Sequence, residues 1–168
     1  HRFDRAEMDK RLVEAHEDPL SHFSHFGEEA NEFDLLEEVF RTYGETGTGR
    51  TRTYVHNEEQ AEQWDCLPGT FTDWRSFEKD TDVLFYEGLH GAVVNDKVNI
   101  AQHADLKVGV VPVINLEWIQ KLHRDKTTRG YSQDAIVDTI LRRMPDYVNH
   151  IIPQFSRSHV NFQRVPLV

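Results

Sequence analysis

Short apolar runs alternate with segments of helical periodicity along this chain, and this alternation limits the possible folds more than any other feature. Two apolar runs, 82–87 and 107–114, are typical of buried strands. Polar–apolar alternation at 50–56 and 160–168 predicts half-buried strands. Helical patterns lie between these segments, at about 5–17, 31–44, 116–126 and 132–145. Because strands and helices interleave, we expect an α/β layered fold.

Local signals predict where the helices begin and end. Asp4, Asn31 and Ser132 each precede a helical pattern and are residue types that cap helix N-termini. Gly44 is expected to end the second helix. Pro145 should kink or end the last helix, because an interior proline costs about 3 kcal/mol.

Composition limits the possible partners. A chain of 168 residues with 38% hydrophobic residues can bury one core, so we expect one domain or part of one. The formal net charge of -10 argues against nucleic acid as a partner. Cys66 is the only cysteine, which fits a reducing compartment such as the cytoplasm. No apolar run approaches the roughly 20 residues needed to cross a membrane.

The segment 121–129 gathers cations in an otherwise acidic chain. Lys121, Arg124 and Asp125 stand at i, i+3 and i+4, so a helix would place them on one face, and Arg129 follows. The segment 119–145 contains six basic residues and only three acidic ones. A bound phosphate would explain this local excess. The alternative is a solvated helix face whose Lys121–Asp125 pair is worth a few tenths of a kcal/mol.

Glu87 ends the apolar run 82–87 and precedes a glycine. A carboxylate at the end of a strand is well placed to hold Mg²⁺, directly or through water. The alternative is a carboxylate that caps loop amides.

Several sequence blocks carry a more specific signal. They resemble phosphoribulokinase, in particular its bacterial class, in register over essentially the whole chain. The blocks are HRFDR at 1–5, YGETGTGRTRTYVH at 43–56, FYEGLHGAVV at 85–94, VPVINLEWIQK at 111–121, HRD at 123–125, PQF at 153–155 and NFQRVP at 161–166.

This resemblance implies a fold and a reaction. The fold would be a P-loop kinase-like mixed sheet flanked by helices, with residues 1–168 forming a single, incomplete phosphoribulokinase/uridine kinase-like domain. The reaction would transfer the γ-phosphoryl group of ATP, with Mg²⁺, to the O1 hydroxyl of ribulose 5-phosphate in the Calvin cycle. Such chemistry depends mainly on positioning and on cations that stabilise the transferring group.

The resemblance also implies roles for residues near the sugar and the metal. His1 and Arg5 match positions that bind the sugar phosphate, and Arg129 matches a further contact to it. His56 lies in a block that the family uses around its substrate site. Glu87 matches the acid at the Walker B-like strand end, near the metal.

Three further residues match the mobile lid of the family. Asp125 matches a carboxylate that is important for catalysis and for cation binding. Lys121 and Arg124 match cations that contact phosphate, and Lys121 and Asp125 are the expected catalytic residues. We expect Lys121, Arg124 and Arg129 to converge on a bound anion, with Asp125 and Glu87 close by.

Parts of the family pattern lie outside this sequence. In the family, the nucleotide-phosphate loop and the acid proposed as general base precede the position of His1, and further strands follow the position of Val168. We therefore expect the 168-residue chain to be an interior piece that is inactive alone. The bacterial class also implies activation by NADH and a homo-oligomer, whereas a single cysteine argues against thiol control.

Two other functions remain open. One is another P-loop kinase, such as a relative of uridine kinase; the blocks around Tyr54 and at 161–164 argue against it. The other is a non-catalytic binding or assembly protein on a kinase-like scaffold.

Overall fold

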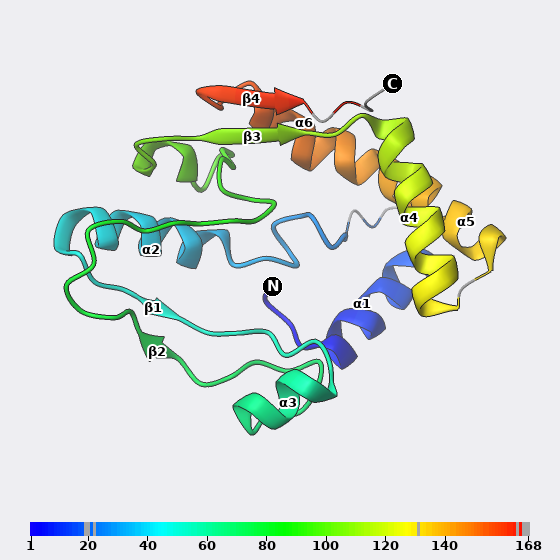
Figure 1. Cartoon of the computed structure of the whole chain (residues 1–168), viewed down its shortest axis with the longest axis horizontal. Coiled ribbons are helices and arrows are strands. Elements are labelled where there is room, and N and C mark those ends of the chain that lie inside the picture. The colour runs from blue at the N-terminus through cyan, green and yellow to red at the C-terminus, as the bar shows by residue number, and fades with distance from the viewer. Residues whose placement is uncertain (19–20, 22, 131, 164, 166–168) are drawn as a thin grey trace. The chain divides into compact units, whose positions relative to one another are not determined.

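The computed structural model describes residues 1–18, 21, 23–130, 132–163 and 165, with the backbone alone at residues 128 and 129. The chain forms two compact units, His1–Ala104 and Asp105–Val168. Each unit has its own helices and one pair of strands (Figure 1). That residues 1–168 form a single partial domain stays a prediction.

Helix α1 (Arg5–Glu17) begins where the sequence predicts. The Asp4 side chain accepts a hydrogen bond from the Glu7 N–H at 2.8 Å. This bond satisfies one of the amides that the first turn of a helix leaves without an intrahelical partner, and such a cap is typically worth about 1 kcal/mol. Met8 is buried on the inner face of the helix. The capping signal in the sequence is therefore confirmed.

The predicted start of the second helix at Asn31 is wrong by one residue and in its physical cause. Helix α2 (Phe33–Thr46) has Glu32 at its N-cap, without a side-chain capping bond. The buried Asn31 amide instead donates to the carbonyls of His25, at 2.9 Å, and Gly27, at 2.8 Å. Asn31 therefore stabilises the preceding loop, because its amide finds two carbonyls there.

The predicted stop at Gly44 is also wrong. Gly44 lies within α2, and the helix ends three residues later at Gly47, whose φ of +66° is left-handed. The Gly47 N–H donates to the Tyr43 carbonyl at 2.8 Å. The helix ends at the glycine that adopts the left-handed conformation, since glycine pays no Cβ penalty there.

The core of the first unit forms where α2 meets a later loop and a 3₁₀ turn, η1 (Ile100–His103). Phe33 and Phe40 share one face of α2 because they are two helical turns apart. Ile100 is fully buried against them. The other members of this core are Val93 and Val98, with Leu36, Val39, Leu84 and Ala104 packed around them.

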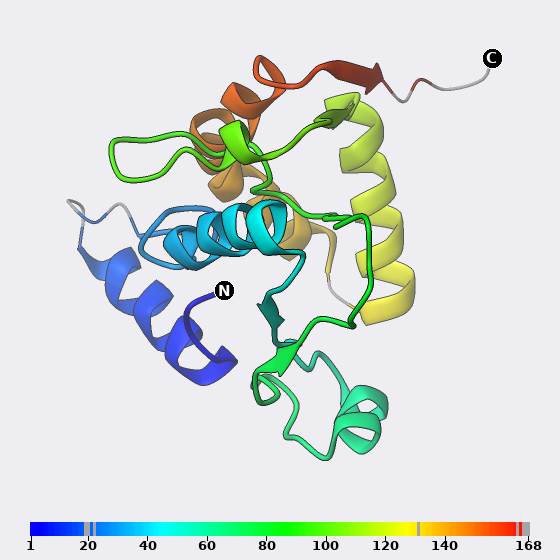
Figure 2. The ribbon, with the colours of Figure 1, turned by 90° about the vertical axis from the view of Figure 1, so that its left-hand side faces the viewer.

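The predicted strand at 50–56 is only partly formed. Strand β1 (Arg50–Thr51) pairs antiparallel with β2 (Arg75–Ser76), and the chain continues to a single bridge between Tyr54 and Phe71. Helix α3 (Glu58–Trp64) lies between these two paired segments in the sequence. Figure 2 shows the two short strands side by side, with α3 beyond them.

The predicted buried strand at 82–87 is wrong. The segment is irregular, and Val83 and Phe85 are 76% and 87% exposed. Leu84 packs against the core of the first unit, and the Tyr86 ring contacts Phe40 in that core. A strand needs a neighbouring backbone to satisfy its hydrogen bonds, and no segment within the described ranges forms a ladder with 82–87.

The strands predicted at 107–114 and 160–168 form in part, as a parallel pair in the second unit. Their predicted burial is wrong, because Val108 and Val110 are exposed and all four residues of the second strand are exposed. Strand β3 (Val108–Val111) pairs with β4 (Val160–Gln163), with Val108 opposite Val160. Gly109 is buried in β3, where a Cβ atom would meet the side chain of Asn161 on β4. A larger residue at this position would therefore displace the Asn161 side chain.

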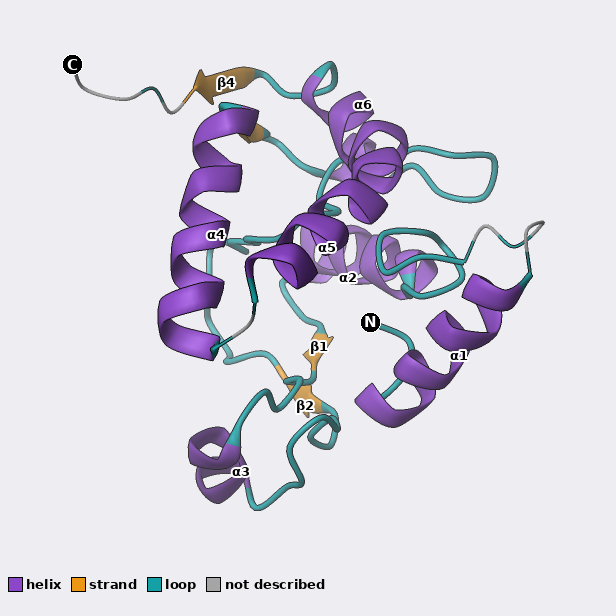
Figure 3. Cartoon of the chain, turned by 90° about the vertical axis from the view of Figure 1, so that its right-hand side faces the viewer, coloured by secondary structure: helices purple, strands orange, loops and turns teal. Residues whose placement is uncertain are grey.

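Helices α4 (Ile114–Arg129) and α5 (Gln133–Asp146) follow β3 and pack against each other (Figure 3). The predicted cap at Ser132 is confirmed, because its hydroxyl accepts a hydrogen bond from the Ala135 N–H at 3.2 Å. Across the described stretches of the chain, no helix combines the length and the apolar character needed to span a bilayer.

Pro145 lies in the last turn of α5, so the prediction that it kinks or ends this helix is confirmed. A π-helical turn, η2 (Tyr147–Ile151), follows and leads into the short α6 (Ile152–Phe155). Proline has no N–H to donate to the preceding turn, and single π turns are a common way to absorb such an irregularity.

Candidate functional site

Helix α4 brings together the acid and two of the cations that the sequence singles out. Lys121 Nζ lies 2.5 Å from Asp125 Oδ2, and Arg124 Nε lies 2.9 Å from Asp125 Oδ1. The Asp125 side chain is only 4% exposed, whereas that of Arg124 is 55% exposed. The predicted single face is therefore confirmed. A buried acid also argues against the alternative of a wholly solvated helix face.

The charge state of Asp125 follows from two opposing effects. Burial alone would raise the pKa of its carboxyl group, because desolvation disfavours the charged form. The hydrogen bonds and positive charges of Lys121 and Arg124 outweigh burial, so the pKa of Asp125 lies below its ordinary value of 3.8. Asp125 is thus an anion at neutral pH, and it holds two cations in fixed positions.

Arg129 is the last residue of α4, and its side chain lies outside the described residues. Its convergence with Lys121 and Arg124 therefore stays a prediction. Gly130 ends the helix with a φ of +70°, and its N–H donates to the Asp125 carbonyl. The end of α4 is thus fixed one turn beyond the acid.

Helix α5 contributes a further cation near Asp125. Burial lowers the pKa of Arg143 and the charge of Arg142 lowers it further, while the charges of Asp146 and Asp125 act in the opposite direction. By contrast, Arg142 forms an exposed pair with Asp138 on the same helix, at 2.8 Å. The sequence pattern did not relate Arg143 to Asp125, because the two residues lie on different helices.

In the first unit, the ring of Tyr54 connects His1 with His56. The Tyr54 ring contacts the His1 ring edge-on, with 5.9 Å between the centroids, and the His56 ring at 4.8 Å. On another side, Tyr54 contacts Phe71 at 5.2 Å. The structure therefore unites two of the expected substrate-binding residues, which lie far apart in the sequence. Their role in binding stays a prediction.

Arg5 joins the same group through the backbone. Its guanidinium donates to the His56 carbonyl at 2.8 Å, and its backbone N–H donates to the Gly69 carbonyl at 2.8 Å. Gly69 in turn donates to Val55, the neighbour of His56, at 2.6 Å. His1, Arg5 and His56 thus form one exposed cluster in the first unit.

Replacing Gly69 by alanine should disturb this cluster. Gly69 has a φ of +84°, and an added Cβ atom would lie 2.8 Å from the Cβ atom of Arg5. The left-handed conformation alone costs about 1–2 kcal/mol for alanine. Gly47→Ala is a matched control, because Gly47 has a φ of +66° but no atom near its Cβ position. Urea unfolding of both full-length variants should show the larger loss of stability for Gly69→Ala. Equal losses would mean that contact with Arg5 does not matter.

Glu87 is exposed, but the strand on whose end it was predicted to lie is absent. It follows Tyr86, whose ring packs on Phe40 and whose pKa is raised mainly by burial. Glu87 belongs to the first unit and Asp125 to the second. Their predicted proximity, and a shared metal, therefore stay predictions.

Tyr54 contacts His1 and His56, and with Arg5 these residues form what we call the His1 cluster. Sequence reasoning did not select Tyr54 as a site residue. The available signal was the alternation at 50–56, which places Tyr54 and His56 on the same face of an extended segment. Its contact with His1, in contrast, depends on a long-range approach that no local pattern reports.

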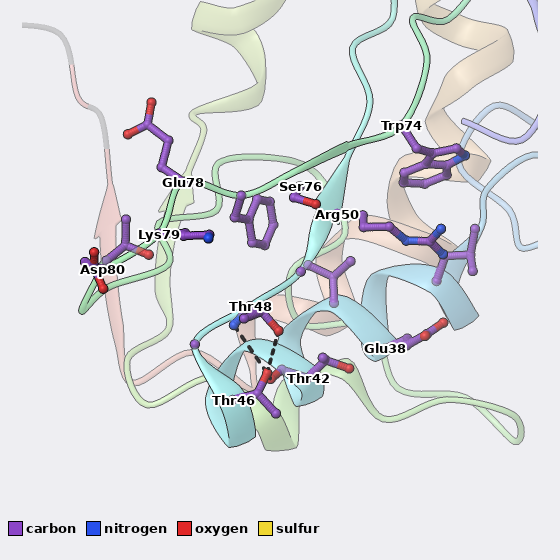
Figure 4. Close-up of a pocket in the computed structure, with 16 residues that line it drawn as sticks. Glu38, Thr42, Thr46, Thr48, Arg50, Trp74, Ser76, Glu78, Lys79 and Asp80 are labelled. Carbon is purple, nitrogen blue, oxygen red and sulfur yellow. Dashed lines mark hydrogen bonds between the residues drawn. The ribbon is translucent and has the colours of Figure 1, made fainter.

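A pocket of about 710 Å³ opens in the first unit, between α2 and the strands β1 and β2 (Figure 4). It is lined by Trp74 and Phe77, by threonine hydroxyls and by charges of both signs, including Arg50 and Glu38. None of the predicted site residues is among the described residues that line it. Mixed charges give the pocket no preference for an anion.

Comparison with known proteins agrees with the motifs. The model of the phosphoribulokinase/uridine kinase family matches residues 1–168. The phosphoribulokinase of Nitrobacter vulgaris is 64% identical to this chain over 168 residues, and the probable phosphoribulokinase of Escherichia coli K12 is 55% identical. The chain spans 58% of the length of each of these curated relatives.

A solved structure gives the same result for the backbone. Phosphoribulokinase from Rhodobacter spheroides matches the whole chain with a TM-score of 0.85 and 61% identity, and the chain covers 58% of that structure. The predicted fold class, an incomplete α/β kinase fold, is thereby confirmed, although its sheet is represented here by two separate strand pairs. Since the family model matches from the first residue to the last, the chain belongs to the phosphoribulokinase/uridine kinase family.

Proposed function

We propose that the full-length protein is a phosphoribulokinase. It transfers the γ-phosphoryl group of ATP to the O1 hydroxyl of ribulose 5-phosphate, and the ribulose 1,5-bisphosphate formed serves CO₂ fixation in the Calvin cycle. Family membership and the names of relatives that are 55–64% identical support this proposal.

The observation that carries the proposal is the buried Asp125 between Lys121 and Arg124. A transferring phosphoryl group carries negative charge on its oxygens, and fixed cations stabilise that charge best when they need not reorganise. In this proposal Lys121 and Arg124 face the phosphoryl group. Asp125 holds them in place and remains ionised at neutral pH.

A second set of residues would bind the phosphate of the sugar. His1 and Arg5 would bind its 5-phosphate, with His56 beside them and Arg129 adding a further contact. The clustering of the first three in one unit supports this assignment. Arginine suits such a role because its planar guanidinium matches phosphate oxygens in pairs.

Mg²⁺ would enter with ATP. In the part of the chain that the structure describes, no three histidine, cysteine, aspartate or glutamate side chains are arranged to hold a metal. Mg²⁺ commonly binds through one or two carboxylates together with substrate phosphates. Glu87, whose carboxylate is exposed, and Asp125 would supply those carboxylates. Bound Mg²⁺ neutralises phosphate charge.

Three further properties belong to the same proposal. NADH would activate the enzyme, and the enzyme would form a homo-oligomer, as the bacterial class implies. The enzyme would work in the cytoplasm, where ATP is supplied.

A substrate panel tests the proposal. The full-length protein should release ADP from ATP with ribulose 5-phosphate as acceptor, with the new phosphate on O1, and should prefer this sugar to uridine. Residues 1–168 alone should show no such activity. Preference for uridine would instead indicate a uridine kinase relative, and no ATP-dependent phosphorylation of any acceptor would indicate a binding or assembly protein.

A further inference from the structure

Arg52 lies where three segments of the first unit meet. Its guanidinium pairs with Glu32, the N-cap residue of α2, at 2.8 Å. The same Nη2 atom is 3.4 Å from the backbone carbonyl of His1. Both side chains of the ion pair are about three-quarters buried, at 21% and 25% exposed. Arg52 therefore connects the start of α2 with the segment that carries His1.

The Arg52 guanidinium also packs against two aromatic rings. Its carbon lies 3.9 Å from the centre of the Phe71 ring and 4.9 Å from that of Trp74. A guanidinium can stack its planar face on a ring while the N–H groups at its edge donate hydrogen bonds, and a lysine ammonium has no such plane. The setting therefore suits an arginine better than a lysine.

The rings continue from Arg52 to the His1 cluster. Phe71 stacks under Arg52 and also contacts Tyr54 at 5.2 Å. Tyr54 in turn contacts the imidazole rings of both His1 and His56. Arg52 therefore reaches His1 by two routes, through its backbone carbonyl and through the rings of Phe71 and Tyr54.

We propose that Arg52 is a positioning residue that fixes His1 for binding of the sugar substrate. Arg52 acts through His1 and makes no contact of its own with the substrate. The inference rests on the proposed function, in which His1 binds the sugar phosphate. It assigns to Arg52 and Glu32 a role in affinity for the sugar and none in affinity for ATP.

Steady-state kinetics of full-length variants test this role. Arg52→Gln and Glu32→Gln should raise the KM for ribulose 5-phosphate by about tenfold, since small displacements of a binding group are costly, and leave the KM for ATP within about twofold. Arg52→Lys should restore little of the loss, because it keeps the charge but not the stacked plane. The control is Arg41→Gln, which breaks the exposed Arg41–Glu45 pair on α2 and should change neither KM.

A double variant separates positioning from direct binding. If Arg52 acts through His1, adding Arg52→Gln to His1→Ala should raise the KM for ribulose 5-phosphate no further than His1→Ala alone. Additive effects, or an unchanged KM in Arg52→Gln, would overturn the inference. If Arg52→Gln fails to fold, Glu32→Gln and Arg52→Lys decide in its place. A wild-type protein without ribulose 5-phosphate kinase activity would refute the proposed function itself.

Discussion

Replacing Asp125 by asparagine in the full-length protein should lower kcat by about 10²- to 10³-fold, the usual loss when one preorganised electrostatic contact is removed. The substitution keeps the shape of the side chain but removes its charge. Lys121 and Arg124 then lose the anion to which both are bonded, and an amide N–H₂ group faces at least one of them. Initial rates at saturating ATP and ribulose 5-phosphate measure the effect.

Asp138→Asn is the matched control for this experiment. Asp138 also pairs with an arginine on a helix, Arg142, but both side chains are more than half exposed. Exposed pairs of this kind contribute about 0.3–0.5 kcal/mol, so kcat should stay close to that of the wild type. An Asp125→Asn variant with wild-type kcat would remove the acid from the mechanism and weaken the assignment of Lys121 and Arg124.

The stability that Asp125 contributes should depend on pH. The pKa of Asp125 is lowered in the folded state, so its contribution is fully present above the ordinary value of 3.8 and is lost as pH falls through the lower folded value. The difference in free energy of unfolding between the wild type and Asp125→Asn should therefore be constant from about pH 7 to about pH 5 and shrink in stronger acid. Urea unfolding at several pH values measures it. A difference that grows as pH falls below the ordinary pKa would contradict the lowered pKa.

Replacing Ile100 by alanine should lower the free energy of unfolding by about 2–5 kcal/mol. Ile100 is fully buried in the core of the first unit, against Phe33, Phe40, Val93 and Val98. Removing three carbons loses their transfer free energy and leaves a cavity that the surrounding rings fill only in part. Urea unfolding of the full-length protein, followed by far-UV circular dichroism, measures the change.

Ile119→Ala provides the comparison. Ile119 lies on α4 and is 63% exposed, so the same loss of carbons should change stability by about 0.5 kcal/mol or less. Similar losses for the two variants would show that Ile100 is not part of a tightly packed core.

The sequence predicted those parts of the fold that depend on neighbouring residues. Asp4 and Ser132 cap their helices as expected, because a cap needs only its own side chain and an amide three residues on. The strand predicted at 82–87 failed because strand formation depends on a partner far away in the sequence. The helix cap predicted at Asn31 does not form for a related reason, since the side-chain amide of Asn31 donates to two loop carbonyls instead.

In the candidate site, too, local contacts were predictable and long-range contacts were not. The contacts of Asp125 with Lys121 and Arg124 follow from helix spacing alone and were predictable. The approach of His1 to Tyr54 and His56 joins residues more than 50 positions apart, and no periodic pattern reports it. The resemblance to a family supplied His1, Arg5 and His56 as candidates. Only the structure supplied Tyr54, which contacts both His1 and His56, and Arg52, which contacts the His1 carbonyl.

The parallel pairing of β3 with β4 has a consequence for how the protein emerges from the ribosome. At the edge of this pair, the Lys107 N–H bonds to the ring of His159, 52 residues further along the chain. The apolar strand Val108–Val111 therefore cannot pair with β4 until both long helices and the π-helical turn have been synthesised. During that delay an unpaired, valine-rich edge is open to other nascent chains. Chaperones that shield apolar segments should therefore bind nascent chains that end between these two strands more strongly than chains that already include β4.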